Sequence, residues 1–130
     1  MSFIAKLQLQ HEGEMNVLQC GFRFSQSIDA TGKPTAMPQG GIIKLVLESN
    51  GNTDLFDWMI NPLHIKNGKI TFFRYDSMSR LKTLLFENAH CIEYCETFCH
   101  AGEHPMQIQL TISAHMIQLN ESAFKNNWPQ

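Results

Sequence analysis

The sequence predicts a mainly β protein, an antiparallel barrel or sandwich with one short α-helix. Apolar and polar residues alternate with a period of two over most of the chain. Helical spacing is confined to one short segment, and turn-forming residues separate the alternating segments. With 130 residues, of which 43% are hydrophobic, the chain is long enough to bury a core, so we expect one domain over residues 1–130.

The first part of the chain contains three predicted strands and a long loop. Residues 3–9 alternate as a half-buried strand does. A second strand is expected to carry its apolar side chains on one face, namely Leu18, Cys20, Phe22 and Phe24. The polar segment 26–41, rich in Gly, Pro, Thr and Ser, then leads to an apolar strand over residues 42–49. A loop of about 15 residues is longer than most connections, which predicts a functional or mobile segment.

The middle of the chain contains the only predicted helix, over residues 53–60. Asn52 or Thr53 is its expected N-cap, and the Asn61-Pro62 pair ends it. Asn67-Gly68 stands between two extended runs and predicts a tight hairpin turn, because both residues tolerate positive φ.

The second half of the chain is expected to form long strands. One extends over residues 80–99, and after the turn "HAGEHP" another extends over residues 106–119. In the latter, four apolar side chains alternate with polar ones almost without fault, and these are Ile108, Leu110, Ile112 and Ala114.

Charge and terminal sequence exclude several classes of function. Ten basic and twelve acidic side chains, with no run of Lys or Arg, argue against a nucleic-acid binder, which requires a basic face, although local basic patches stay open. The N-terminus lacks a secretory signal and no stretch is apolar over a bilayer-spanning length, so we expect synthesis in the cytoplasm and no membrane insertion. Four cysteines in a reducing compartment are expected to be free thiols.

The stretch "CIEYCETFCHAGEH" is the part of the sequence that most suggests chemistry. Cys91, Cys95 and Cys99 share parity, so on a strand they would point to one face as small buried residues. Strand residues four apart are separated by roughly 13 Å, too far for two of these sulfurs to share a zinc ion. Cys99, His100 and His104 form the only local trio with any capacity to bind metal, and the signal is weak.

No catalytic motif stands out elsewhere. The sequence contains no GxSxG, HExxH, Walker or GxGxxG pattern. We therefore expect a protein that is not an enzyme, with no catalytic residue, no metal and no cofactor.

Two segments resemble the haemolysin-coregulated protein family (Hcp, also called TssD), the tube protein of bacterial type VI secretion systems. "LLFENAHCIEYCETF" resembles the strand of that family with the pattern NA-x-x-x-x-Y-x-E-x-F, and "MQIQLTISAHMIQL" resembles its closing strand with LTISA. A long polar loop, a strand and one short helix also follow in the matching order. The resemblance covers most of the chain and implies an Hcp-like antiparallel β-barrel with one short α-helix.

The resemblance implies a mechanical function. Such proteins assemble into hexameric rings that stack into a hollow tube, which a contracting sheath ejects together with a VgrG-like spike protein and effectors. The expected location is then cytoplasmic on synthesis, followed by secretion through the type VI apparatus without a signal peptide. In the polar loop, we expect inter-subunit or inter-ring contacts from Lys33, Pro34, Thr35, Met37 and Pro38.

Other readings of the residues stay open at this point. A tail-tube protein of another contractile phage-like machine would share the fold. A monomeric β-barrel that binds a small ligand would show a closed internal cavity. A small metal-dependent enzyme would be built around Cys99, His100 and His104. Fold alone does not choose among these functions.

Overall fold

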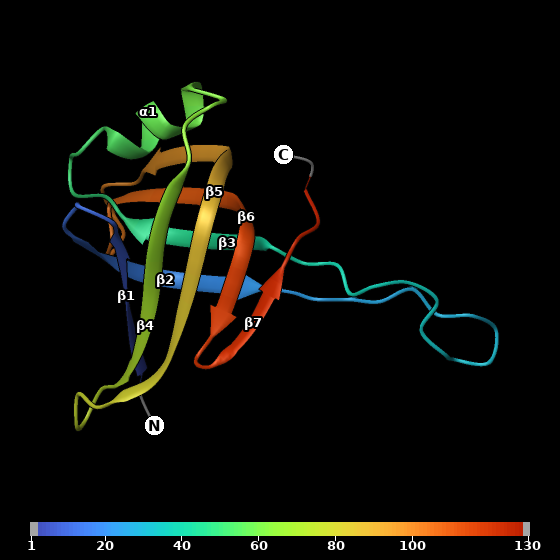
Figure 1. The fold of residues 1–130 in the computed structure, drawn as a ribbon. Coiled ribbons are helices and arrows are strands. Elements are labelled where there is room, and N and C mark those ends of the chain that lie inside the picture. The colour runs from blue at the N-terminus through green and yellow to red at the C-terminus, as the bar shows by residue number, and fades with distance from the viewer. Residues whose placement is uncertain (1–2, 129–130) are drawn as a thin grey trace.

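A computed structural model describes residues 3–128 and shows seven strands and one helix (Figure 1). In chain order the elements are β1 (Phe3–Leu9), β2 (Glu14–Phe22), β3 (Ile42–Glu48), α1 (Asp54–Ile60), β4 (Lys66–Arg74), β5 (Arg80–Phe98), β6 (Met106–Leu119) and β7 (Ser122–Lys125). The predicted mainly β class with one short helix is confirmed. The short strand β7 had not been predicted.

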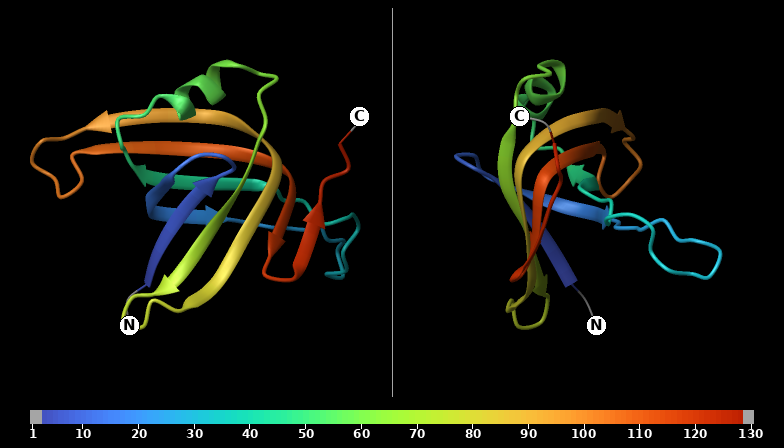
Figure 2. Two further views of the ribbon diagram at one scale, coloured as in Figure 1. Left: turned by 60° about the vertical axis from the view of Figure 1, so that its left-hand side comes forward. Right: turned by 45° about the vertical axis from the view of Figure 1, so that its right-hand side comes forward.

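The strands form a closed antiparallel barrel. Their order is β3-β2-β1-β4-β5-β6-β7, and an additional pairing of β3 with β6 closes the first six into a cylinder. Strand β7 pairs with the end of β6 outside that closure. Strands β5 and β6 extend well past the barrel body to the turn that joins them, as the left view of Figure 2 shows. Residues 80–89 of β5 pair with β4, whereas residues 90–98 pair with β6 alone.

Apolar side chains fill the barrel interior. The predicted alternation in β6 is confirmed, because Ile108, Leu110, Ile112 and Ala114 are all 0–2% exposed. Side chains from the facing strands complete the core, including Leu7, Leu9, Ile43, Leu45, Leu47, Ile70, Leu84 and Phe86. At roughly 1.5–3 kcal/mol per buried aliphatic or phenyl side chain, this core is the main stabilising contribution. A barrel interior filled with side chains argues against the alternative of a monomeric β-barrel that binds a small ligand in an internal cavity.

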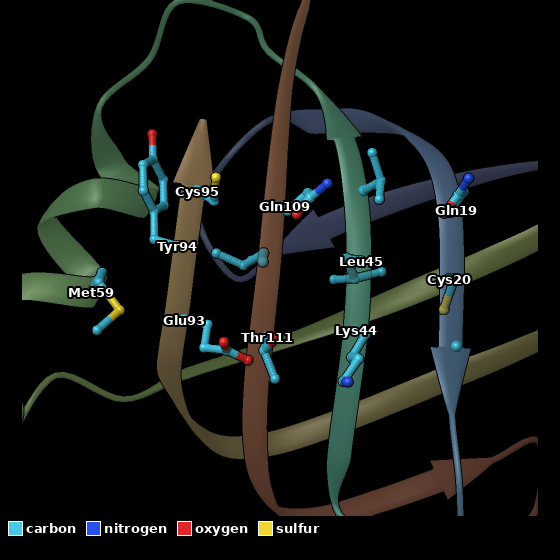
Figure 3. A pocket seen from close by; sticks show the side chains of 13 residues that line it. Gln19, Cys20, Lys44, Leu45, Met59, Glu93, Tyr94, Cys95, Gln109 and Thr111 are labelled. Atoms are coloured by element: carbon cyan, nitrogen blue, oxygen red, sulfur yellow. The ribbon is translucent and has the colours of Figure 1, made fainter. Parts of the chain in front are cut away.

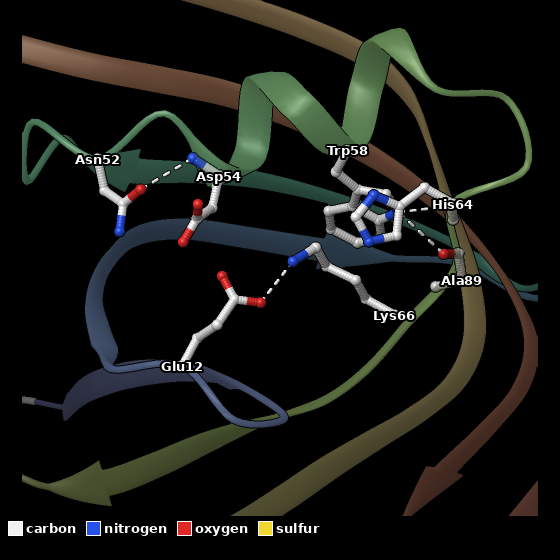
Figure 4. Close-up of polar contacts among 7 residues, drawn as sticks. All are labelled: Glu12, Asn52, Asp54, Trp58, His64, Lys66 and Ala89. Atoms are coloured by element: carbon white, nitrogen blue, oxygen red, sulfur yellow. Dashed lines mark hydrogen bonds and ion pairs between the residues drawn. The ribbon is translucent and has the colours of Figure 1, made fainter.

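The helix covers one end of the barrel through two buried side chains, Leu55 and Trp58. The indole N–H of Trp58 donates to the carbonyl oxygens of His64 (3.1 Å) and Ala89 (3.2 Å), as Figure 4 shows. Thr53 occupies the cap position without a side-chain hydrogen bond, whereas Asn52 Oδ1 accepts the Asp54 amide at 2.9 Å. The predicted helix is thus confirmed, and the side-chain acceptor at its start comes from Asn52.

Lys66, at the start of β4, lies close to the same end of the barrel. It forms an ion pair with Glu12 and its Nζ lies 5.9 Å from the centre of the Trp58 ring (Figure 4). The β1–β2 turn is thereby tied to the helix side of the barrel.

The expected hairpin turn at Asn67-Gly68 is wrong, because both residues lie inside β4. A Cβ at Gly68 would stand 2.7 Å from the Phe86 ring and 3.0 Å from the carbonyl oxygen of Gln8. Glycine is therefore required at position 68 because the neighbouring strands approach closely there. The hairpin turn that the Asn67-Gly68 pair predicts does not form. Asn67 Oδ1 instead accepts the amide of Asn88, which carries the positive φ of 52°.

The predicted apolar face of the second strand is also partly wrong. The register of β2 against β3 shifts between Val17 and Gln19, as a β-bulge does. The inward side chains are therefore Met15 and Val17 before the shift, and Cys20 and Phe22 after it. The extra residue reverses the side-chain parity, which a simple period of two cannot anticipate.

Candidate assembly surface

Four strand segments form an extended sheet on one flank of the barrel, which we call the polar sheet. It consists of residues 90–98 of β5, residues 106–113 of β6, all of β3, and residues 19–22 of β2. Each segment is antiparallel to its neighbour, so β5 and β2, at the two sides, run in opposite directions.

The two faces of the polar sheet differ in chemistry. Leu45 and Leu110 on the inner face are buried in the barrel core. The outer face has polar side chains from all four strands, and together they line a shallow hollow (Figure 3). Its exposed members include Gln19, Lys44, Glu93, Cys95 and Gln109, and Thr111 lies buried among them. The outer face of the polar sheet is therefore polar, whereas its inner face packs against the barrel core.

Both sides of the polar sheet end in a free strand edge. Residues 19–22 of β2 pair with β3 and have no partner in β1, which pairs only as far as Val17. Residues 90–98 of β5 pair with β6, and β4 pairs with β5 only as far as Ala89. Within residues 3–128, these backbone groups thus have a ladder partner on one side only. Free edges of this kind are templates for pairing with another strand.

The prediction that the three cysteines of β5 share one buried face is wrong. The β5–β6 register shifts between Cys91 and Glu93, so side chains beyond that point swap faces. Cys91 is buried, with its Sγ 3.7 Å from the sulfur of Met59, whereas Cys95 lies exposed on the outer face of the polar sheet and Cys99 is exposed in the following turn.

Burial also determines the chemistry of two thiols. It raises the pKa of Cys91 to about 11, an effect that hydrogen bonding with the backbone of Glu93 offsets only in part. Burial raises the pKa of Cys20 to about 11 as well. Both side chains therefore remain thiols at neutral pH and are poor nucleophiles.

The trio of Cys99, His100 and His104 does not come together as a site. His104 Nδ1 lies 3.4 Å from Glu48 Oε2, while Cys99 uses its backbone amide to close the turn with Pro105. Within the part of the chain that the structure describes, no three or more His, Cys, Asp or Glu side chains are placed to hold a metal ion.

Residues 23–41 form a long projection, which we call the arm (Figure 1). Two short antiparallel contacts hold its sides together, one between Ser25 and Gln39 and one between Ile28 and Pro34. The residues predicted to make inter-subunit contacts all lie on it, with Met37 81% exposed. They are Lys33, Pro34, Thr35, Met37 and Pro38.

The tip of the arm is held in a defined turn by one carboxylate. Asp29 Oδ1 accepts hydrogen bonds from the amide of Thr31 (2.8 Å), the Thr31 hydroxyl (2.7 Å) and the amide of Lys33 (3.1 Å). These bonds, the Thr31 side chain first, lower the pKa of Asp29. The arm is therefore exposed and yet locally ordered.

Sequence reasoning missed the C-terminal residues that contact the arm. Phe124, Asn126 and Trp128 lie beside its base and on the adjoining strands. Two aromatic side chains in an otherwise polar terminal segment were the available signal. Among residues 3–128, no helix has the length and apolar character needed to cross a membrane.

A comparison with known proteins agrees with this architecture. No curated protein sequence matches the chain. The solved structure of Hcp1 from Flavobacterium johnsoniae is 34% identical, with a TM-score of 0.88, and the match covers 95% of this chain and 99% of that one. Hcp1 from Salmonella typhimurium has the same fold at 12% identity and a TM-score of 0.74, over 95% and 92% of the two chains.

More distant similarity extends to other contractile machines. A chain of the sheath–tube complex of an extracellular contractile injection system has a TM-score of 0.55 at 19% identity, covering 91% of this chain and 88% of that one. The family model described as hemolysin coregulated protein Hcp (TssD) matches residues 1–129. The chain, with its closed barrel, single helix and long arm, therefore belongs to the Hcp (TssD) family of type VI secretion tube proteins.

Proposed function

We propose that this chain assembles head to tail into hexameric rings, and that stacked rings form the inner tube of a type VI secretion system. The observation that carries the proposal is the pair of free edges on opposite sides of the polar sheet. A heterologous contact that joins two different edges generates a ring when its rotation closes. Family membership supports the tube role itself.

Strand direction favours this arrangement. The four strands of the polar sheet alternate in direction, so rotation of a copy about an axis parallel to them brings β2 of one copy antiparallel to β5 of the next. The backbone groups of residues 19–22 and 90–98 would then gain ladder partners. Ile92 and Phe98, which are 45% and 68% exposed in the single chain, would lose exposure beside the junction.

The position of the barrel body relative to the polar sheet indicates which face of the sheet would line the tube. The barrel lies entirely behind the inner face, where Leu45 and Leu110 are buried. In a closed ring the bulkier side occupies the larger circumference, so the outer face with Gln19, Lys44 and Gln109 would face the lumen. The lining would combine amide side chains with both signs of charge, from Lys44 and Glu93, which suits the passage of varied effectors because no single class is bound strongly.

The ends of the polar sheet suggest how rings stack. The arm leaves one end, and the β5–β6 turn lies at the other (Figure 2). Residues 45–65 and 83–124 contain no Lys or Arg, and the end opposite the arm has five carboxylates in nearby segments: Glu48, Asp54, Asp57, Glu96 and Glu103. The arm contains Arg23 and Lys33. Stacking would place Lys33, Pro34, Thr35, Met37 and Pro38 of one ring against the acidic end of the next.

The further partners follow from the family. A sheath, a VgrG-like spike protein and effectors are proposed to act with the assembled tube, which sheath contraction would eject from the cytoplasm. The relative from a sheath–tube complex supports a sheath around the tube.

Two matched glycine variants test the ring. A Cβ at Gly21, on the free edge of β2, and a Cβ at Gly13, in the β1–β2 turn, would each meet no atom within 4 Å. Both Gly21→Glu and Gly13→Glu should therefore fold. We expect light scattering and negative-stain images to show rings of six chain masses for the wild type and for Gly13→Glu, and monomers for Gly21→Glu. A monomeric wild type at high concentration, or intact Gly21→Glu rings, would overturn the proposal.

A further inference from the structure

We infer that Phe124, Asn126 and Trp128 form a clasp that fixes the direction of the arm and thereby sets the stacking of rings. We call these three residues the clasp. The inference rests on the proposed stacking role of the arm, but the clasp itself is a feature of the single chain. The segment that follows β6 thus becomes a positioning element for an assembly contact made far from it.

Asn126 is the central residue of the clasp. Its Nδ2 donates to the carbonyl oxygen of Gly40 in the arm (3.1 Å) and to that of Ala114 in β6 (2.9 Å). Its backbone amide donates to the carbonyl oxygen of His115 (2.7 Å), and the amide of Ala114 donates to Gly41 (2.7 Å). The side chain thereby bridges the returning side of the arm and the strand beneath it, because one amide group satisfies two carbonyls.

The outgoing side of the arm is held by an aromatic contact. The Phe24 ring packs edge-on against Phe124, with centroids 4.8 Å apart, and a Cβ at Gly40 would overlap the Phe24 ring. Gly41 has a φ of 102°, and a Cβ there would run into the Asn126 amide and the carbonyl oxygen of Ala114. The two adjacent glycines therefore permit a close approach that side chains would block.

Trp128 anchors the clasp to the barrel. Its ring stacks on His115 of β6 at 5.1 Å, with an interplanar angle of 25°, and lies 5.7 Å from the His90 ring of β5. Aromatic pairs of this kind contribute about 0.5–1.5 kcal/mol beyond the area that they bury. Asn126 is consequently held between β7 on one side and the Trp128 contact on the other.

Because the arm is long, a small change in its direction at the base moves its tip by several ångströms. From Ser25 to the turn at Thr31 the extended chain spans roughly 20 Å, so a 10° change at the base moves the tip by about 3.5 Å. Beyond the base, the sides are joined by the pair between Ser27 and Thr35 (2.8 Å) and the pair between Asp29 and Lys33 (2.9 Å). These hold the arm together, whereas the clasp ties its base to the barrel, together with the Ala114–Gly41 backbone hydrogen bond and the contact of Phe24 with Phe22.

Two variants and one neighbouring control test the clasp. Asn126→Ala removes both side-chain hydrogen bonds, and Trp128→Ala removes the anchor. Asn127→Ala changes an exposed residue between them for which the structure shows no side-chain hydrogen bond. The first readout is hydrogen exchange at the amides of Ser25 and Gln39, each of which donates to the carbonyl oxygen of the other residue across the arm base. We expect exchange about fivefold to tenfold faster in Asn126→Ala and Trp128→Ala, and unchanged exchange in Asn127→Ala.

The second readout separates positioning from simple stability. We expect Asn126→Ala to form rings of wild-type mass that stack into few or short tubes in electron micrographs, while Asn127→Ala stacks normally. Unchanged exchange in both clasp variants would overturn the clasp. If the clasp variants exchange faster but still form tubes like those of the wild type, the clasp has no role in stacking. If wild-type rings do not stack at all, the stacking proposal fails, and the exchange data still decide whether the clasp exists.

Discussion

Trp58 and Ala89 are joined by a hydrogen bond of 3.2 Å from the indole N–H to the carbonyl oxygen, at the point where β4 stops pairing with β5. Beyond Ala89, strand β5 leaves the barrel and becomes the free edge of the polar sheet. The helix thus contacts β5 at the residue where the proposed assembly edge begins.

Replacing Trp58 with Phe tests how much its two hydrogen bonds contribute to the stability of the subunit. The variant keeps most of the buried apolar surface but leaves the carbonyl oxygens of His64 and Ala89 without their donor. We expect a loss of about 1–3 kcal/mol in the free energy of unfolding, measured by urea denaturation. Thr97→Ser, on an exposed part of β5, is a suitable control. A Trp58→Phe variant as stable as the wild type would show that the hydrogen bond has no net effect.

Gly68→Ala tests the close approach inside β4. The added methyl group would meet the Phe86 ring at 2.7 Å and the carbonyl oxygen of Gln8 at 3.0 Å. Overpacking of this kind costs about 1–3 kcal/mol, so we expect a lower thermal midpoint. Gly13→Ala, where a Cβ meets nothing within 4 Å, should change stability by about 0.5 kcal/mol or less. Equal stability of the two variants would contradict the packing argument.

Alkaline pH should destabilise the fold through its buried thiols. Burial raises the pKa of Cys91 from 9.0 to about 11, so the folded state keeps a proton that the unfolded state releases. The resulting stability is fully present below pH 9 and is lost as the pH rises towards 11. Urea midpoints should therefore fall over this range, and the fall should be smaller in Cys91→Ala. Parallel profiles for the two proteins would show that this thiol does not contribute.

Charge reversal on the arm tests the proposed ring stacking. Lys33→Glu should leave the mass of the ring unchanged and abolish tubes, because a carboxylate on the arm would face the acidic end of the next ring. Lys82→Glu, the same change on an exposed residue of β5 away from the arm, should stack normally. Raising salt from roughly 0.05 M to 0.5 M should shorten wild-type tubes. Lys33→Glu tubes of normal length would exclude an electrostatic role for the arm.

Local pattern predicted most of the strands and the helix, because alternation and cap chemistry act over a few residues. It failed at the bulges near Val17 and Cys91, since one extra residue reverses parity without changing composition. It failed at Gly68 because the Phe86 ring that requires a glycine comes from a distant part of the chain. The arm was predicted from its length and composition. Its clasp was not, since contacts such as that between Asn126 and Gly40 join segments 86 residues apart.

The long ladder between β5 and β6 has a mechanical consequence for a tube built as proposed. Eight residue pairs join these strands within the polar sheet, where they run between the arm end of the subunit and the acidic end. A push along the tube axis would load this ladder in shear, so its hydrogen bonds would share the force and would not open one at a time. The strand direction that allows the ring to close would thus also make each subunit stiff along the line of ejection.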